Sequence, residues 1–170
     1  MTPSIDLRIA TILRAVRDVI TPALDENNHL AREQAHLVIG QLKLLAAQWS
    51  RATEYAEVCR ADLAESLAGL DPDGGDRTRQ QFDALSRTLA ANEGPDTEAR
   101  YKALMRASDA LVRAADADGA AAFRSTLRMR LLAFSKRQAV RDRSWFALSG
   151  FDLRSEELSS IDSIIGRISS

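Results

Sequence analysis

The sequence of 170 residues contains few of the residues that mark disulfide-rich or loop-rich proteins. It has one cysteine, four prolines and eight glycines, and aromatic residues make up only 5% of the chain. A single cysteine excludes a disulfide framework and any metal site built from thiolates alone. Turn-forming residues are scarce, whereas alanine, leucine, arginine and glutamate, which favour helices, are abundant. The composition therefore predicts a helical protein.

The chain also lacks an excess of charge of either sign, because 23 basic and 24 acidic residues leave a net charge of −1. This balance argues against a dedicated DNA-binding protein and against a polybasic membrane-binding protein. The most apolar stretch, Leu37–Ala47, is interrupted by polar residues and is shorter than the ~20 residues that a bilayer span requires. The N-terminus has no readable signal peptide. These features predict a soluble cytoplasmic protein with no membrane partner.

Apolar residues recur at helical spacing from the start of the chain. The first stripe begins after Pro3 and continues past Pro22, which predicts a kinked helix and not a clean stop. Its members are Ile5, Ile9, Ile12, Leu13, Val16, Val19, Ile20 and Leu24. The polar run Asp25–Asn28 ends the stripe and offers an N-cap to the next helix.

The second stripe is the most regular, because its members alternate by four and three residues over more than four heptads. They are Val38, Leu42, Leu45, Trp49, Ala52, Ala56, Cys59, Leu63, Leu67 and Leu70. A continuous helix from about residue 29 to 69 would be about 60 Å long, and a break near Ser50 is the alternative. Cys59 falls on this seam, so we expect a buried thiol without reactivity.

The second half of the chain predicts three more helices of substantial length. Asp71–Asp76 is a loop and the best candidate for a boundary between the two halves. The first of these helices carries Phe82, Leu85 and Leu89 and ends at Gly94-Pro95. The second runs from about Asp96 to the turn at Asp116–Gly119 and carries Tyr101, Leu104, Met105, Ser108, Leu111, Val112 and Ala115. The third carries Phe123, Leu127, Leu131 and Phe134 and ends at about Arg143. We therefore predict one all-α domain over residues 1–170. Its fold is an antiparallel helical bundle of four to six helices with one long heptad-patterned helix.

The C-terminal segment from Trp145 to Ser170 combines clustered aromatics with a short apolar stripe. The aromatics are Trp145, Phe146 and Phe151, and the stripe consists of Leu158, Ile161, Ile164, Ile165 and Ile168. A free helix of about a dozen residues is marginal in water, so the stripe needs a surface to cover. We predict that residues 145–170 close the bundle or make an oligomer contact.

His29, Glu33 and His36 form the clearest candidate for a chemical site. The spacing i, i+4, i+7 places the three side chains on one helix face, and the set suits zinc or non-haem iron. Glu33-x-x-His36 also matches the local unit of di-iron bundles, but such bundles need a second unit and this chain has no further histidine. The competing interpretation is two partly exposed histidines with a helical Glu–His contact. We expect no structural metal and no cofactor.

The last long helix is basic and follows an acidic stretch between residues 54 and 76. Its charged residues are Arg124, Arg128, Arg130, Lys136, Arg137, Arg141 and Arg143, against Asp142. This pattern suits either an anion or nucleic-acid surface or complementary pairing between helices. Because the arginines scatter around the helical wheel, we predict pairing and no nucleic-acid partner.

The stretch Asp18–Gln48 resembles a group of small uncharacterised bacterial all-helical proteins. The residues that carry the resemblance are Asp18–Asp25, Ala31–Ala35 and the run Leu37–Ala47. Such proteins tend to be encoded near aminoglycoside-phosphotransferase-like kinases and acyl-CoA metabolism enzymes. The resemblance implies an accessory role beside such enzymes and transfers no catalytic residue.

These observations favour a non-enzymatic helical bundle that acts as an accessory or protein-interaction protein. The expected partner is a second copy in a homodimer, or another protein. The alternative is a metal-binding bundle or enzyme that uses His29, Glu33 and His36. The two differ in whether the histidine face points into a cleft or into solvent.

Overall fold

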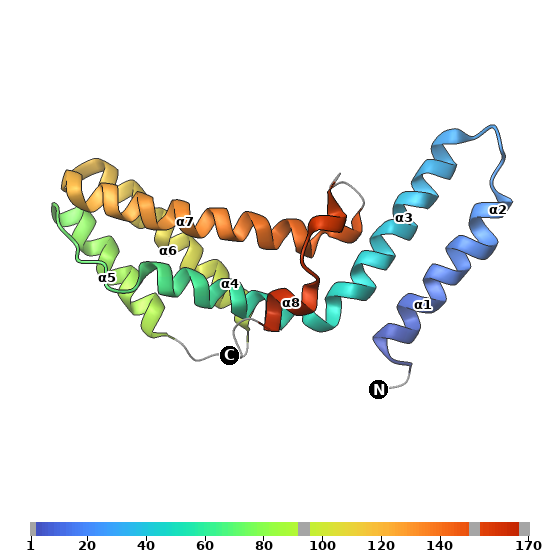
Figure 1. Cartoon of the computed structure of the whole chain (residues 1–170), viewed down its shortest axis with the longest axis horizontal. Coiled ribbons are helices and arrows are strands. Elements are labelled where there is room, and N and C mark those ends of the chain that lie inside the picture. The colour runs from blue at the N-terminus through green and yellow to red at the C-terminus, as the bar shows by residue number, and fades with distance from the viewer. Residues whose placement is uncertain (1–2, 92–95, 150–153, 167–170) are drawn as a thin grey trace. The chain divides into compact units, whose positions relative to one another are not determined.

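The computed structural model describes residues 3–91, 96–149 and 154–166. Within these ranges the chain is helical, without a strand, and the predicted all-α class is confirmed. Figure 1 shows the helices in chain order. Those of eleven or more residues are α1 (Ile5–Ala15), α3 (His29–Gln48), α4 (Ala52–Leu67), α5 (Asp76–Ala90), α6 (Thr97–Asp118) and α7 (Ala121–Trp145).

The chain divides into two compact units. Unit 1 contains residues 1–52 and 142–164, and unit 2 contains residues 53–141 and 165–170. The boundary predicted at Asp71–Asp76 is therefore wrong, because this loop lies inside unit 2. The acidic loop looks like a linker in the sequence, but hydrogen bonds to another loop of the same unit hold it. The prediction of one domain over residues 1–170 stays a prediction.

Unit 1 begins with an antiparallel helical hairpin. The first arm consists of α1, a π-helical turn at Val16–Ile20 and the short α2 (Thr21–Ala23), and α3 returns alongside it. The π turn lies just before Pro22, where the proline ring would clash with a carbonyl of the preceding turn. The arm ends at Ala23 and Leu24 is extended, so the predicted kinked helix continues past Pro22 by a single residue. Asn28 caps α3, since its Oδ1 accepts a hydrogen bond from the Ala31 N–H at 3.0 Å.

The long second helix is interrupted. A 3₁₀ turn at Trp49–Arg51 separates α3 from α4, so the alternative of a break near Ser50 is correct. The heptad seam is confirmed from Ala56 onward, where Ala56, Cys59, Leu63, Leu67 and Leu70 are buried, whereas Ala52 at the start of α4 is exposed.

The seam is wrong in α3. Val38 and Leu45 are 46% and 48% exposed, whereas Ile39 and Leu44 are buried. A 3₁₀ turn advances by three residues per turn, so one straight seam cannot keep its register across the break. In addition, α1 packs against α3 and buries a different face of that helix.

Unit 2 contains the principal core. Helices α4, α5 and α6 and the part of α7 up to Arg141 contribute to it. Its buried members are Leu63, Leu67, Leu70, Leu85, Leu104, Leu111, Ala115, Phe123, Leu127 and Phe134. Met105 was predicted to be in the core and is 46% exposed. The predicted stop at Gly94-Pro95 lies outside the described residues, and α5 ends at Ala90.

Hydrogen bonds join the loops at residues 73–75 and 118–120 of unit 2, and this contact, which we call the clasp, caps the N-terminus of α5. The Gly75 N–H donates to the Asp118 carbonyl at 2.8 Å, and the Ala120 N–H donates to the Asp73 carbonyl at 2.9 Å. The Asp118 carboxylate accepts the N–H and the hydroxyl of Thr78 at 3.0 and 2.6 Å. The Thr78 hydroxyl hydrogen bond lowers the pKa of Asp118, and the positive end of the α5 dipole also favours the carboxylate.

The described part of the C-terminal segment packs in unit 1. Trp145 is buried, and its carbonyl accepts a hydrogen bond from Gln48 Nε2 at 2.8 Å. Asp162, in the short α8 (Ile161–Ile165), pairs with Arg51 at 2.8 Å. The other elements here are 3₁₀ turns at Ala147–Ser149 and Ser155–Glu157. Phe151 and Ile168 lie outside the described residues.

The two roles predicted for residues 145–170, closing the bundle or making an oligomer contact, stay predictions. Across the described helices, we find none with an apolar stretch that could span a bilayer.

Candidate functional site

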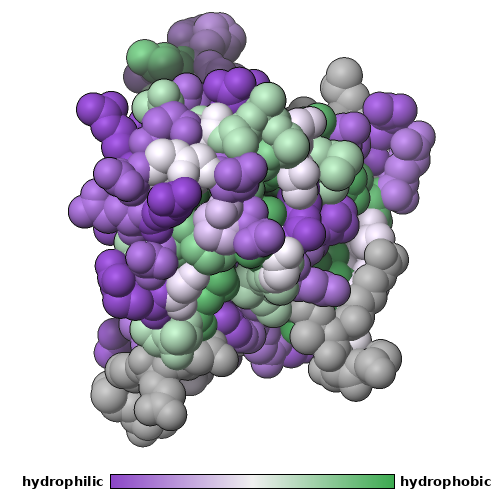
Figure 2. All heavy atoms as spheres, turned by 90° about the vertical axis from the view of Figure 1, so that its left-hand side faces the viewer, coloured by the Kyte–Doolittle hydropathy of each residue, from purple (hydrophilic) through white to green (hydrophobic). Residues whose placement is uncertain are grey.

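Large apolar side chains that remain exposed are concentrated in unit 1. Of the fifteen in the described residues, nine lie in the α1–α3 hairpin: Ile5, Leu7, Ile12, Val19, Ile20, Leu30, Leu37, Val38 and Leu45. By contrast, hydrophilic side chains spread over the end of unit 2 that Figure 2 faces, with apolar ones between them. The hairpin is therefore the part of the molecule with the most uncovered apolar surface.

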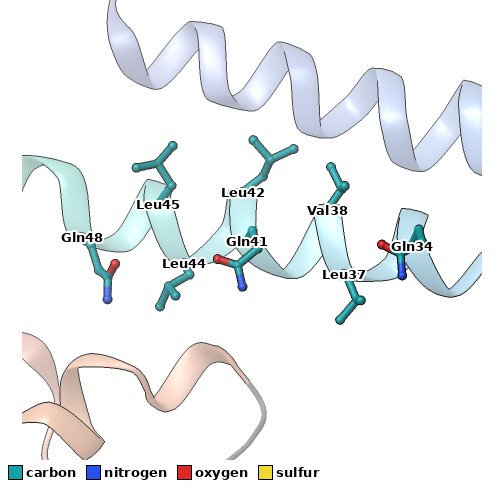
Figure 3. Close-up of a pocket in the computed structure, with 8 residues that line it drawn as sticks. All are labelled: Gln34, Leu37, Val38, Gln41, Leu42, Leu44, Leu45 and Gln48. Carbon is teal, nitrogen blue, oxygen red and sulfur yellow. The ribbon is translucent and has the colours of Figure 1, made fainter.

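A groove of about 560 Å³ runs along α3 over part of this surface. We call its lining the α3 strip, which consists of Gln34, Leu37, Val38, Gln41, Leu42, Leu44, Leu45 and Gln48. In Figure 3, Val38, Leu42 and Leu45 point to one side of the helix, and Leu37 and Leu44 point to the other. The wall of the groove is thus formed by one helix, and its position is fixed by the packing of that helix.

Two neighbours determine which part of α3 stays open. Helix α1 packs along one side of α3, where Ala35 and Ile39 are buried. The Trp49 Nε1–H donates a hydrogen bond to Asp6 Oδ1 at 2.8 Å, which connects the turn after α3 to the first turn of α1. On the other side, the Trp145 carbonyl accepts a hydrogen bond from Gln48 Nε2, and the 3₁₀ turn at Ala147–Ser149 contacts α3, on which Leu44 is buried. Leu37, Val38 and Leu45 remain 44%, 46% and 48% exposed between these contacts.

The α3 strip contains no charged side chain. Charged residues form 28% of the chain, so about two would be expected among eight residues. Depletion of charged residues is typical of the centre of a protein–protein interface, which is also more apolar than the rest of the surface. Chemically, the strip offers dispersion contacts and neutral amide hydrogen bonds, and it offers no acid, base or nucleophile.

The predicted metal ligands lie elsewhere on α3. His29, Glu33 and His36 are all exposed in the N-terminal half of the helix. In the ranges that the structure describes, no three His, Cys, Asp or Glu side chains are grouped so that they could hold one metal ion. Binding of a metal by these three residues stays a prediction.

Four arginines of α7, at positions 128, 130, 137 and 141, bind acidic or backbone groups of unit 2, as the pairing interpretation expected. Arg137 and Arg141 both bind the Asp62 carboxylate, and Arg137 also donates to Ser66 Oγ at 2.9 Å. Arg128 pairs with Asp116 at 2.6 Å. Burial raises the pKa of Asp62, but the hydrogen bonds from Arg137 and Arg141 outweigh this effect and lower it. This network joins α7 to α4 and α6.

Cys59 is 0% exposed, which confirms the prediction of a buried thiol. The α3 strip was missed, because sequence reasoning placed Val38, Leu42 and Leu45 on a buried seam. One available signal was the recurrence of glutamine every seven residues at 34, 41 and 48. Glutamines at this interval beside a leucine repeat mark a helix face that is neither a core nor an ordinary charged surface.

Comparison of the chain with protein-family models, curated proteins and solved structures finds no significant match.

Proposed function

We propose that this chain is a non-enzymatic accessory or protein-interaction protein of the cytoplasm, and that the α3 strip is its contact surface. The observation that carries the proposal is the uncharged, half-exposed face of α3. Unit 2 contains a closed core, whereas α3 in unit 1 has an apolar face that remains about half exposed. A protein surface of matching shape would remove these leucines from water.

The size of the exposed apolar surface supports this proposal. Each fully buried leucine or valine side chain contributes about 1.5–3 kcal/mol. The roughly half-exposed Leu37, Val38 and Leu45 could therefore contribute a few kcal/mol when a partner covers them. Leaving this surface in water would also favour aggregation, so a soluble chain has reason to keep it covered.

Photo-crosslinking in the cell that makes the chain tests the proposal. A photoreactive amino acid replaces Gln41 at the centre of the strip, and a matched variant carries it at Arg113, which is exposed on α6. We expect a covalent adduct with a protein from position 41 and a much weaker one from position 113. Equal adduct yields, or no adduct from position 41, would contradict the proposed function.

The alternative function is metal binding by His29, Glu33 and His36. The observation in its favour is that all three side chains are exposed on one helix, where a metal ion can reach them from solution. Titration of the metal-free protein with Zn²⁺, compared with His36→Ala, tests this alternative separately.

A further inference from the structure

The break between α3 and α4 is not caused by residues that interrupt helices. Residues 41–68 contain neither glycine nor proline. The backbone on both sides of the turn keeps right-handed helical torsion angles, with φ −100° and ψ −37° at Gln48 and φ −60° and ψ −40° at Ala52. A 3₁₀ turn has poorer hydrogen-bond geometry than an α-helical turn, and a short 3₁₀ stretch inside a helix often marks a hinge or a strained sequence. Contacts from elsewhere in the protein therefore hold the turn at Trp49–Arg51.

Three side chains at the turn donate hydrogen bonds to other segments of unit 1. Each bond is 2.8 Å long, and they join Gln48 Nε2 to the Trp145 carbonyl, Trp49 Nε1 to Asp6 Oδ1, and Arg51 Nη2 to Asp162 Oδ1. The donors at positions 48 and 51 thus bind the C-terminal part of unit 1, at the end of α7 and in α8, whereas the donor at position 49 binds α1.

The 3₁₀ geometry allows the two C-terminal contacts to form together. In a 3₁₀ helix, side chains three residues apart are eclipsed, so Gln48 and Arg51 lie one above the other. In an α-helix, with about 3.6 residues per turn, the same two side chains lie about 60° apart around the axis. The pair therefore lines up toward Trp145 and α8 while the turn is 3₁₀, and it separates when the turn is α-helical.

We propose that the turn at Trp49–Arg51 is a conformational switch that the C-terminal part of unit 1 controls. The turn stays 3₁₀ while Trp145 and α8 bind Gln48 and Arg51. When these contacts release, the turn becomes α-helical and joins α3 and α4 into one helix. The coupling acts in both directions, because a segment that binds one conformation better shifts the population toward it.

Neither conformation has a large advantage over the other. The Arg51–Asp162 ion pair is exposed, with side chains 43% and 74% accessible, so it stabilises the 3₁₀ form only weakly. The α-helical form has better hydrogen-bond geometry. It also restores the apolar seam, because Leu45, Trp49 and Ala52 then continue the four- and three-residue spacing of α4. Two arrangements of similar free energy are what a switch requires.

NMR spectroscopy of the full-length protein distinguishes the two conformations. A 3₁₀ turn brings the α-proton of residue i close to the amide proton of residue i+2, whereas an α-helical turn brings it close to the amide proton of residue i+4. In the wild-type chain, we expect i+2 contacts from Gln48 and Trp49. The measurement reports on the turn alone.

The test variant combines Gln48→Met with Asp162→Ala, which removes both C-terminal contacts and leaves residues 49–51 unchanged. Methionine and glutamine have similar helix propensities, so the first change does not itself favour either conformation. We expect the i+2 contacts to lose at least about half of their intensity and i+4 contacts to appear, because the population shifts. The matched control is Asp109→Ala, which removes an exposed ion pair with Arg113 inside α6 and should change neither set.

Intrinsic fluorescence gives an independent measurement, because both tryptophans of the chain belong to these contacts. Trp145 is 7% exposed, so release should admit water and shift the emission to longer wavelength in the double variant. The control should emit like the wild type, and an unchanged emission in the double variant would contradict the release.

The proposal is overturned if the double variant keeps its i+2 contacts, or if it loses them without gaining i+4 contacts, which would indicate a frayed turn. Equal changes in Asp109→Ala would also overturn it. Circular dichroism checks the folding of each variant. If the double variant fails to fold, the single variants decide, and each should show a smaller shift in the same direction.

Discussion

Replacing Leu63 by alanine tests the core of unit 2. Leu63 is 2% exposed and belongs to a cluster that α4, α5, α6 and α7 build together. Leu→Ala substitutions in rigid cores cost about 2.7 to 5 kcal/mol, and the cost rises by about 24 cal/mol for each Å³ of cavity that remains. Leu67, Leu85 and Leu127 are equally buried and are held by different helices, so little collapse is expected. We therefore predict a loss in the upper half of this range, about 3.5–5 kcal/mol.

The assay for Leu63→Ala is guanidinium unfolding followed by far-UV circular dichroism, with the slope checked for constancy. The matched control is Leu132→Ala, at a position 57% exposed on α7, which should change stability by less than about 0.5 kcal/mol. A loss below about 1 kcal/mol for Leu63→Ala would refute this description of the core. Both tryptophans, Trp49 and Trp145, lie in unit 1. Their fluorescence should follow the same transition if residues 1–170 form one cooperative domain.

Three further predictions concern a loop, a carboxylate and the metal question. Gly74→Ala should cost about 1–3 kcal/mol in the same unfolding assay, because φ at Gly74 is +157° and a Cβ would lie 2.7 Å from Gly119 Cα. Gly40→Ala should instead stabilise the protein by up to about 1 kcal/mol, because Gly40 lies in α3 with open space around it. Because folding lowers the pKa of Asp62, the ionised carboxylate stabilises the fold fully above its unfolded pKa of about 3.9, and this stabilisation is lost as the pH falls further. Asp62→Asn should therefore reduce the fall in melting temperature between neutral and acid pH. The melting temperature should not change in EDTA, and a large drop that His36→Ala abolishes would establish a structural metal, which contributes about 10–16 kcal/mol.

Apolar spacing was sufficient to predict the helical class and most of the core. In α4, Cys59, Leu63 and Leu67 are buried as their spacing indicated, because one seam faces one core. The same spacing failed in unit 1, at Val38 and Leu45 of the second stripe and at Ile5, Ile12, Val19 and Ile20 of the first stripe, which are exposed. The 3₁₀ turn at Trp49–Arg51 changes the register, and apolar spacing alone does not show where a helix tightens.

The clasp at Asp118 and the α3 strip depend on contacts that local sequence does not encode. Asp116–Gly119 was predicted as a turn, but the capping of α5 joins residues forty positions apart, such as Thr78 and Asp118. For α3, the sequence shows apolar residues on more than one face. Only the packing of α1 and of the segment after Trp145 shows which face remains open.

Amide hydrogen exchange of the chain alone and with the protein that crosslinks at position 41 tests the central claim, that another protein covers the α3 strip. With this partner present, we expect slower exchange in residues 34–48, because association suppresses local opening. Residues 104–115 of α6, whose buried side chains belong to unit 2, should exchange at the same rate in both samples. Exchange in residues 34–48 that the partner leaves unchanged, or equal slowing in α6, would contradict the account.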